Sequence, residues 1–372
     1  MPAQDKHKKV PRYAILDPES VEQYAKSTRL GHYDLLPYEV FWRERHQYLK
    51  DSGLLLRPRY APKWKPSWIG TNLDPTYCED SIMLVDHQVI DARRQVNNEL
   101  VAIKKCRNDS QELKIAQFLS SIKDPANHAV HVYDILPDPF DSNISLMVMP
   151  FLRPCNDPEF STVGDVVEFI NQMIEGLAFL HRLRIAHRDI AVANIMMDAR
   201  PLYPDGYHPV RLDYSPDALR EVTPSPRIGR SIKYYYIDFG LAVHIPRGGS
   251  PYVVGDVGRD TDVPELSHDV PYDAFKVDIF ALGNLFSKQF EQRYNSMDFL
   301  VPLIDKMKRR RPEERPTAEE VLREWESIRA DLDESLFRWR LGPKSEPAIE
   351  RMFNDTVAVA WEGVYRLRKL VG

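Results

Sequence analysis

The stretch Ile185–Asn194, which reads I-A-H-R-D-I-A-V-A-N, restricts the possible folds of this chain more than any other part of its sequence. It precedes a second short signature, Tyr235–Gly240 (Y-Y-I-D-F-G). The first segment offers Asp189, which is able to orient and deprotonate a hydroxyl, and Asn194, which is able to hold a metal. In the second segment, Asp238 offers a carboxylate to a metal that bridges phosphate oxygens. A phosphoryl-transfer site needs such parts, because its catalysis is mostly positioning and charge neutralisation.

A long helical pattern, Val163–Arg182, leads directly into the first of these segments. Its mostly apolar positions recur at spacings of three and four, as on one face of an α-helix. We expect this face to pack in the core and not to bind a ligand. The positions are Val166, Ile170, Met173, Ile174, Leu177 and His181.

Size and composition are those of a soluble globular protein. The 372 residues can hold one large bilobal domain or two, and 43% of them are hydrophobic and 28% charged. The net charge of −5 gives no reason to expect nucleic acid or an anionic membrane as a partner. No run approaches the ~18 apolar residues of a membrane span, and no apolar run follows the basic N-terminus as in a secretory signal.

The cysteines indicate a reducing compartment. Cys78, Cys106 and Cys155 are widely spaced and odd in number, unlike a metal cluster or a disulfide framework. We therefore expect an intracellular, cytoplasmic protein. The basic run Lys306–Arg311 leaves a nuclear address open, although runs of charge are more often solvated turns.

The order H-R-D, four residues, N, followed by D-F-G, is similar to the eukaryotic protein kinase superfamily. Further matches are the V-A-I-K strand at Val101–Lys104, the V-P-E of Val263–Glu265 where the family has A-P-E, and R-P-T-A-E-E at Arg315–Glu320. Asp238–Leu266 resembles the family's activation segment in length and position. The resemblance covers about residues 81–328, and its departures are similar to those of kinase-like proteins found in fungi.

This resemblance implies an α+β, bilobal protein-kinase-like fold, with a small antiparallel β-sheet lobe, a larger mainly helical lobe, and ATP and Mg²⁺ as cofactors. An insertion at about 198–233 lies within the 43 residues that separate Asn194 from Asp238, and its six prolines predict an irregular surface loop. The expected parts are an N-terminal extension at 1–71, the N-lobe at 72–149, the C-lobe at 150–330 and a C-terminal helical extension at 331–372.

Several elements are expected from local patterns. A helix capped by Asp109 or Ser110 runs to Ser121, and the C-terminal extension ends in helices that carry Trp339, Trp361 and Tyr365. The expected strands are Ser81–Val85, Val89–Arg93, Leu100–Cys106, about Val130–Leu136, Ile144–Met149, Ile195–Met197 and Tyr234–Ile237.

The N-terminal extension is expected to begin with a disordered stretch, Met1–Pro11. Tyr38–Lys50 has apolar residues near helical spacing and predicts an amphipathic helix stopped by Gly53. The arm R-P-R-Y-A-P-K-W-K-P-S-W follows, and we expect its Trp64 and Trp68 to pack on the domain. A proline-rich ligand or a nucleic-acid-binding strip with interleaved aromatics is the alternative.

The resemblance also implies catalytic roles. Asp189 accepts the proton from, or orients, the substrate hydroxyl. Lys104 holds the α- and β-phosphates and pairs with Glu112, the acidic residue of the helix that follows. Arg188 ties the catalytic loop to a phosphorylated activation segment. The candidate phosphorylation sites are Ser250, Tyr252 and Thr261.

The remaining implied site residues bind metal and adenine. Asn194 and Asp238 hold Mg²⁺. The adenine bonds to the hinge backbone, for which Met149 is the gatekeeper, Phe151 follows, and Leu152 is the expected donor. In the helical lobe, the resemblance implies that Asp278 is buried and accepts hydrogen bonds from the catalytic-loop backbone, and that Arg315 pairs with Glu265. A capping box joins Thr317 to Glu320.

Two departures bear on catalysis. The family's glycine-rich loop is absent, because Ile82, Leu84 and His87 occupy its glycine positions, and their side chains would obstruct phosphate. Ala191 and Ala193 occupy the places where the family carries a lysine or an arginine to neutralise the γ-phosphate. Losing such a cation costs on the order of 10²–10³ in rate, by analogy with removal of a transition-state donor.

The prediction is therefore an atypical, slow ATP-dependent protein kinase acting on protein serine or threonine hydroxyls. The first alternative is a pseudokinase scaffold, motivated by the missing glycines. The second is a kinase of small molecules on a related fold, against which the protein-substrate platform of Val263–Glu265, Asp278 and Arg315 argues.

Overall fold

The structure is a computed structural model that describes residues 10–354 and 356. Contacts group the chain into two units, each assembled from three segments. Unit 1 contains a five-stranded antiparallel sheet and unit 2 is mainly helical, so the predicted α+β class is confirmed. The domain boundaries given above stay a prediction. Unit 1 comprises the described part of Met1–Asn108, with Val132–Phe151 and Arg200–Ser225; unit 2 comprises Asp109–His131, Leu152–Ala199 and the described part of Pro226–Gly372.

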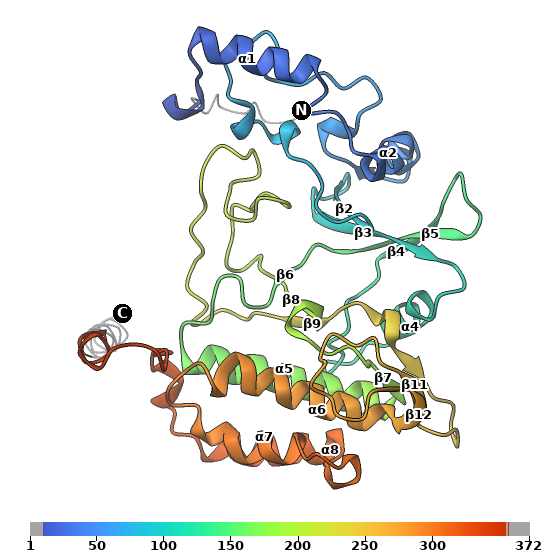
Figure 1. Cartoon of the computed structure of the whole chain (residues 1–372), viewed down its shortest axis with the longest axis vertical. Coiled ribbons are helices and arrows are strands. Elements are labelled where there is room, and N and C mark those ends of the chain that lie inside the picture. The colour runs from blue at the N-terminus through green and yellow to red at the C-terminus, as the bar shows by residue number, and fades with distance from the viewer. Residues whose placement is uncertain (1–9, 355, 357–372) are drawn as a thin grey trace. The chain divides into compact units, whose positions relative to one another are not determined.

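The sheet of unit 1 has the strand order β1-β2-β3-β5-β4, and the ladder of β2, β3 and β5 is visible in Figure 1. The predicted turn at Asn97–Asn98 joins β2 to β3, with Asn98 at φ 56°, a left-handed conformation that asparagine tolerates. In this unit three of the predicted strands, β2, β3 and β5, are confirmed, and the strand expected about Val130 begins later, at Asp134. The bounds are β1 Leu54–Leu55, β2 Val89–Arg94, β3 Leu100–Arg107, β4 Asp134–Pro137 and β5 Ile144–Pro150.

The N-terminal helices of unit 1 cover one face of this sheet. Ile90 pairs with Ile103, which in turn pairs with Val148, so these side chains project from the same face. The helices α2 (Pro37–Glu44) and α3 (His46–Asp51) contribute fully buried side chains to the same cluster. Its buried members are Trp42, Leu49, Leu54, Leu56, Tyr60, Leu84, Ile90, Ala92, Val101, Ile103, Leu146 and Val148.

The single helix predicted over Tyr38–Lys50 is in fact two. The backbone leaves the helical region at Arg45 (φ −91°, ψ 0°), where α2 ends and α3 begins. The buried Arg45 guanidinium donates to the Phe41 carbonyl at 2.9 Å and to both carboxylate oxygens of Asp138. An ion pair with a residue far along the chain thus accompanies the break, whereas Gly53 follows α3 at φ 81° as predicted.

The strand predicted at Ser81–Val85 is wrong. The Leu84 N–H donates to Glu39 Oε1 at 3.0 Å, and the Leu84 carbonyl accepts from the Tyr38 hydroxyl at 2.9 Å. These side chains satisfy the backbone groups that a sheet ladder would otherwise use. The strand β1 lies earlier in the chain, and residues 56–88 connect it to β2.

The proline- and tryptophan-rich arm packs within unit 1, as expected. Trp68 is buried, and its indole N–H donates to Thr28 Oγ1 at 2.9 Å. The Trp64 indole donates to Asp80 Oδ2 at 2.8 Å, and the two tryptophan rings meet edge to face with centroids 6.2 Å apart. Both indole N–H groups are therefore engaged within the protein.

Glu39 is the centre of a buried polar network. Its carboxylate accepts from Arg59 Nε at 3.0 Å and Nη2 at 2.9 Å, and from the Tyr60 hydroxyl at 3.0 Å. The backbone N–H groups of Leu36 and Leu84 donate to it as well, each at 3.0 Å. Burial raises the pKa of Glu39, but the hydrogen bonds from Arg59 and from the two backbone amides outweigh it, so that the net pKa is lowered.

The free energy of unfolding is expected to decrease at acid pH, because Glu39 becomes protonated there. Because the folded-state pKa of Glu39 lies below its ordinary value of 4.5, its contribution is complete above that pH and is lost as the pH falls through the folded-state pKa. Urea unfolding between about pH 6 and about pH 3 measures the decline. The free energy of unfolding of the Glu39→Gln variant is expected to decrease less steeply with falling pH than that of the wild type. An identical slope would contradict the role assigned to Glu39.

The first part of the insertion, Arg200–Ser225, belongs to unit 1. It is irregular as predicted, with no helix or strand in this fully described stretch apart from one isolated bridge, between Tyr214 and Glu221. It is more than a surface loop, however, because Leu202, His208 and Ala218 are fully buried.

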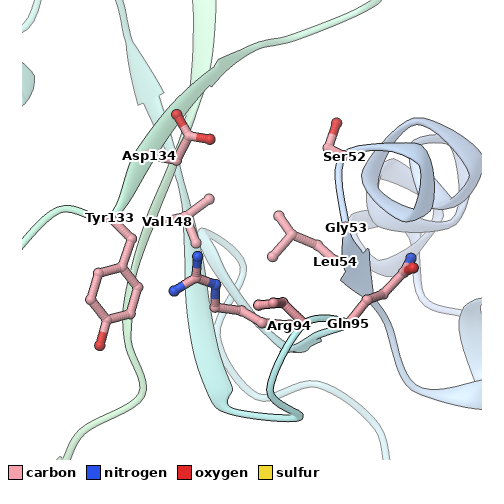
Figure 2. A pocket seen from close by; sticks show the side chains of 9 residues that line it. Ser52, Gly53, Leu54, Arg94, Gln95, Tyr133, Asp134 and Val148 are labelled. Carbon is pink, nitrogen blue, oxygen red and sulfur yellow. The ribbon is translucent and has the colours of Figure 1, made fainter.

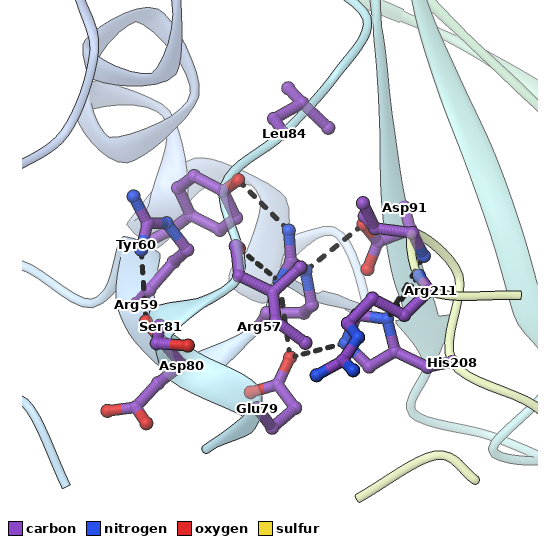
Figure 3. A network of polar contacts seen from close by, with 12 residues as sticks. Arg57, Arg59, Tyr60, Glu79, Asp80, Ser81, Leu84, Asp91, His208 and Arg211 are labelled. Atoms are coloured by element: carbon purple, nitrogen blue, oxygen red, sulfur yellow. Dashed lines mark hydrogen bonds and ion pairs between the residues drawn. The ribbon is translucent and has the colours of Figure 1, made fainter. Parts of the chain in front are cut away.

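His208 brings the insertion to a cluster of charged side chains, shown in Figure 3. Its Nε2 lies 3.6 Å from Glu79 Oε1. Glu79 in turn lies 3.4 Å from Arg57 Nη1, and Arg57 Nε lies 3.2 Å from Asp91 Oδ1. The connection between β1 and β2 is thereby joined to the insertion and to β2 itself.

Unit 2 is built around α5, for which the predicted bounds are confirmed. Thr162 caps the helix by accepting from the Asp165 N–H, and the Asp165 side chain returns to the Thr162 N–H, a capping box. The helix α5 packs against α8, and α6 packs against α7 (Figure 1). The bounds are α4 Gln111–Ser120, α5 Val163–Arg182, α6 Ala274–Phe286, α7 Val301–Met307 and α8 Ala318–Asp331, with a three-stranded sheet of β6 Arg153–Pro154, β8 Ile195–Met197 and β9 Tyr234–Tyr236.

Some predictions concern the chain ends. The prediction that a helix carries Trp339 is wrong, because α8 ends at Asp331 and Trp339 follows the 3₁₀ turn Leu336–Arg338, with 57% of its surface exposed. Trp361 and Tyr365 lie outside the described residues, as does most of Met1–Pro11. Within the part of the chain that the structure describes, no helix has the length and apolar character to cross a membrane.

Candidate active site

Asp278 holds the backbone of the H-R-D loop in unit 2. This fully buried aspartate on α6 accepts from the His187 N–H at 2.8 Å and from the Arg188 N–H at 2.7 Å. His181 Nε2 lies 2.9 Å from the same carboxylate. The predicted burial of Asp278 and its bonds to the catalytic-loop backbone are therefore confirmed.

The His187 ring joins this loop to the segment that carries Asp238. His187 Nδ1 accepts from the Asp189 N–H at 3.3 Å, so Nε2 carries the proton and donates to the Ile237 carbonyl at 3.0 Å. The ring is buried, with its centroid 5.0 Å from that of Phe239. The histidine thus couples the positions of the two signature segments.

The Asp189 carboxylate is directly bonded to Asn194. Asn194 Nδ2 donates to Asp189 Oδ2 at 2.7 Å and to the Asp189 carbonyl at 2.8 Å. The Arg259 N–H donates to Asp189 Oδ1 at 2.6 Å, and Arg259 Nε lies 3.4 Å from Oδ2. Two predicted site residues are in contact, together with an arginine that the sequence analysis did not identify.

Asn194 and Asp238 flank one end of the β8–β9 ladder. Asn194 directly precedes β8, and the Ile237 N–H that precedes Asp238 donates to the Asn194 carbonyl at 3.0 Å. Asp238 has the left-handed φ of 61°, and a Cβ on Gly240 would lie only 3.3 Å from Asp238 Oδ1. A glycine at 240 therefore keeps this carboxylate uncrowded.

This donor set fits Mg²⁺ bound together with phosphate. The Asn194 amide N–H groups face Asp189, which leaves the carbonyl Oδ1 for a cation. Among the described residues, no group of three or more His, Cys, Asp or Glu forms a dedicated metal cage. Mg²⁺ is typically held by one or two protein ligands and completes its octahedron with water and substrate phosphates.

Arg188 contacts the activation segment in the unmodified chain. Its Nη2 donates to the Val254 carbonyl and to the Tyr272 hydroxyl, each at 2.9 Å, and its Nη1 donates to the Leu241 carbonyl at 3.3 Å. Val254 belongs to β11 (Tyr252–Gly255), and Tyr272 to its partner strand β12 (Ser267–Asp273). The pairing of Arg188 with a phosphorylated residue stays a prediction.

The end of the activation segment is anchored on the helices. The buried Arg315 guanidinium donates to both carboxylate oxygens of Glu265, one of them at 2.8 Å, so this predicted pair is confirmed. The predicted capping box is also present, because Thr317 Oγ1 accepts from the Glu320 N–H at 3.3 Å while the Glu320 carboxylate accepts from the Thr317 N–H at 2.7 Å. Arg315 is thereby held at the start of α8.

The predicted residues of unit 1 share one face of the sheet. Lys104 pairs with Met147, and Ala102 pairs with Met149, so these four side chains project opposite to the apolar cluster described above. The Phe151 N–H continues the ladder by donating to the Leu100 carbonyl at 3.3 Å. Across this face, Ala102 also pairs with a charged residue of β2, Asp91.

Asp91 and Arg57 were not identified from the sequence. Asp91 is buried beside Arg57, and burial raises its pKa in spite of that cation. Arg57 lies near the start of residues 56–88, the long connection between β1 and β2, and Asp91 lies on β2 itself. The sequence could have indicated this pair, because an aspartate within the strand Val89–Arg94 is buried and a buried charge requires a partner.

The other predicted residues lie on separate elements of unit 2. Glu112 is in the first turn of α4, which Ser110 caps by accepting from the Leu113 N–H at 3.3 Å. The helix α4 packs against the turn that follows Asp238. The pairing of Lys104 with Glu112, and the adenine contacts of Met149, Phe151 and Leu152, stay predictions.

Unit 1 also has a pocket of about 430 Å³, shown in Figure 2. Apolar side chains of Leu54 and Val148 line it together with the polar side chains of Arg94 and Asp134. None of the predicted site residues is among those that line it. We therefore assign it no part in the candidate site.

Comparison with known proteins agrees with this geometry. The model of the protein kinase domain matches residues 87–298, and the chain therefore belongs to the protein kinase family. It is also similar to serine/threonine-protein kinase CAK1 of Saccharomyces cerevisiae, with 26% identity over 146 residues. The aligned part is 37% of this chain and 33% of that protein, so the chain spans about a third of the length of this curated relative.

Proposed function

We propose that this protein is an ATP-dependent protein kinase that transfers the γ-phosphoryl group to serine or threonine hydroxyls of protein substrates. The observation that supports this best is the position of the Asp189 carboxylate. It accepts a hydrogen bond from Asn194, and Asp278 holds the backbone of the loop that carries it. Membership of the protein kinase family supports the reaction class. The name of the similar yeast protein favours serine and threonine over tyrosine.

In unit 2, Asp189 orients the acceptor hydroxyl and takes its proton. Asn194 Oδ1 and the Asp238 carboxylate hold Mg²⁺, which neutralises charge on the phosphate oxygens when bound. Arg188 connects the catalytic loop to the activation segment, and phosphorylation of that segment would strengthen this connection.

Lys104 binds the α- and β-phosphates, and Glu112 is its proposed ion-pair partner. Met149 and Phe151 bound the adenine site, and the Leu152 N–H donates to the base. The proposed partners are ATP and a protein substrate; neither a membrane nor a nucleic acid is included. We place the protein in the cytoplasm, with the nucleus as an additional compartment, in an atypical kinase branch like that found in fungi.

The test is transfer of radiolabelled phosphate from ATP to a generic protein acceptor. Asp189→Asn is expected to lower the rate by about 10²–10⁴-fold, because it removes the general base. Asp205→Asn, an exposed aspartate of the insertion, is the matched control and should retain wild-type turnover. Equal transfer by wild type and Asp189→Asn, with similar thermal unfolding curves, would remove Asp189 from the mechanism.

A pseudokinase scaffold is the second candidate. It is favoured by residues 56–88, which stand between β1 and β2 in place of a tight glycine-rich turn. Such a scaffold would bind nucleotide weakly or not at all. Thermal unfolding with millimolar Mg-ATP separates the two candidates, since a ligand that binds the folded state raises the midpoint temperature. An unchanged midpoint, together with absent transfer, would favour the scaffold.

A further inference from the structure

Arg259 of the activation segment reaches the catalytic-loop aspartate through both its backbone and its side chain. Its N–H donates to Asp189 Oδ1 at 2.6 Å, and its Nε lies 3.4 Å from Asp189 Oδ2. The side chain is 53% exposed, and this is its only ion pair among the described residues. A guanidinium has five N–H donors, so most of them remain available to a ligand beside Asp189.

The catalytic loop has no cationic side chain between Asp189 and Asn194. Ala191 and Ala193 stand between Asp189 and Asn194, and neither can neutralise phosphate charge. Phosphoryl transfer spreads negative charge over the equatorial oxygens of the moving group, and a positioned arginine is well suited to that charge because its planar fork bonds two oxygens at once.

Contacts on both sides of Arg259 hold this segment against the catalytic loop. A Cβ on Gly258 would lie 3.2 Å from the Arg188 carbonyl, so a glycine permits the close contact. On the other side of Arg259, Asp260 accepts from the buried Asn284 Nδ2 at 2.8 and 2.9 Å. Lys288 donates to Asp262 at 2.7 Å, and this bond lowers the pKa of Asp262. Anchors on α6 and the residues after it therefore hold the segment at Asp189.

We propose that Arg259 supplies the cation that the catalytic loop lacks and contacts the transferring phosphoryl group; this inference rests on the proposed function. In that step the substrate hydroxyl oxygen forms a bond to the γ-phosphorus, and the bond from this phosphorus to the β–γ bridging oxygen breaks. ADP leaves with the electron pair, and the hydroxyl proton passes to Asp189. Arg259 binds the phosphoryl oxygens while their charge shifts.

The experiment measures kcat and KM for ATP with full-length variants. Arg259→Ala is expected to lower kcat about 10²-fold while KM for ATP changes little, because the interaction forms mainly in the transition state. Arg259→Lys keeps a charge but not the planar fork, so its kcat should lie between those of wild type and Arg259→Ala. Adding Ala191→Lys to Arg259→Ala should recover much of the lost rate, because it restores a cation two residues after Asp189. Arg247→Ala, an exposed arginine of the same segment, is the control and should match wild type.

The outcomes separate this inference from the proposed function. If wild type transfers phosphate and Arg259→Ala retains its kcat, Arg259 is not catalytic. A rate above wild type in Arg259→Ala would also overturn the inference, because the segment would then obstruct Asp189. If wild type and Asp189→Asn both fail to transfer phosphate, it is the proposed function that fails. Thermal unfolding of each variant shows whether a lost rate reflects lost folding.

Discussion

Substituting Arg315 with alanine is expected to lower the free energy of unfolding by about 3–5 kcal/mol, the cost of breaking a buried ion pair on one side. The guanidinium is fully buried and donates to Glu265 and to three backbone carbonyls, those of Arg309 at 2.7 Å, Lys276 at 2.8 Å and Arg310 at 3.3 Å. Alanine would leave the Glu265 carboxylate, which is 12% exposed, without its cation, and the three carbonyls without a donor.

Urea unfolding of the full chain measures this loss. Arg311→Ala is the matched control, because Arg311 is 75% exposed and only 3.6 Å from a half-exposed Glu314; its effect should stay within about 0.5 kcal/mol. Arg315→Lys keeps the charge but loses the planar fork, so we expect an intermediate loss. A change in Arg315→Ala as small as in the control would mean that Glu265 and the carbonyls find other partners.

Substituting Glu39 with alanine is the second change with a large expected effect, again about 3–5 kcal/mol. The Arg59 side chain opposite it is fully buried, so the variant would leave a positive charge in the core with the Asp80 carbonyl as its remaining acceptor. The Tyr60 hydroxyl and the Leu84 N–H would also lose their acceptor. Because Leu84 joins the apolar cluster of unit 1, packing and polar bonding are expected to be lost together.

The control for Glu39 lies on the same helix. Glu44 is 57% exposed and 3.7 Å from Arg45, so Glu44→Ala is expected to change the free energy of unfolding by less than about 0.5 kcal/mol. The double variant Glu39→Leu with Arg59→Met removes both charges and should be less destabilised than Glu39→Ala. If the double variant is the less stable of the two, the remaining hydrogen bonds, and not the unpaired charge, dominate the cost.

The features that the sequence predicted best depend on local patterns. The bounds of Val163–Arg182 were predicted correctly because apolar periodicity and a capping threonine act within one helix. Local patterns also predicted β2 and β3 and the asparagine turn that joins them. The anchors Asp278 and Arg315 were predicted through family resemblance, and their bonds to the catalytic loop and to Glu265 are observed.

The features that the sequence did not predict depend on partners far along the chain. The break at Arg45 accompanies a bond to Asp138, and the irregular backbone at Leu84 depends on Glu39. The strand β1 is two residues long, too short to carry an alternating pattern. Arg259 was missed because an arginine in a glycine-rich segment has no distinguishing neighbours, and only its position beside Asp189 marks it.

The order in which the segments of unit 1 occur has a consequence for how the chain acquires its structure during synthesis. The sheet strands are complete by Pro150, yet the histidine that faces Glu79 and the arginine that donates to the Thr76 carbonyl belong to residues 200–225. A ribosome must therefore translate α5 and the whole H-R-D loop before the sheet-bearing unit can close its charged cluster. A fragment that stops at residue 151 carries every strand of the sheet but leaves Glu79, the carboxylate beside Arg57, without the histidine that faces it.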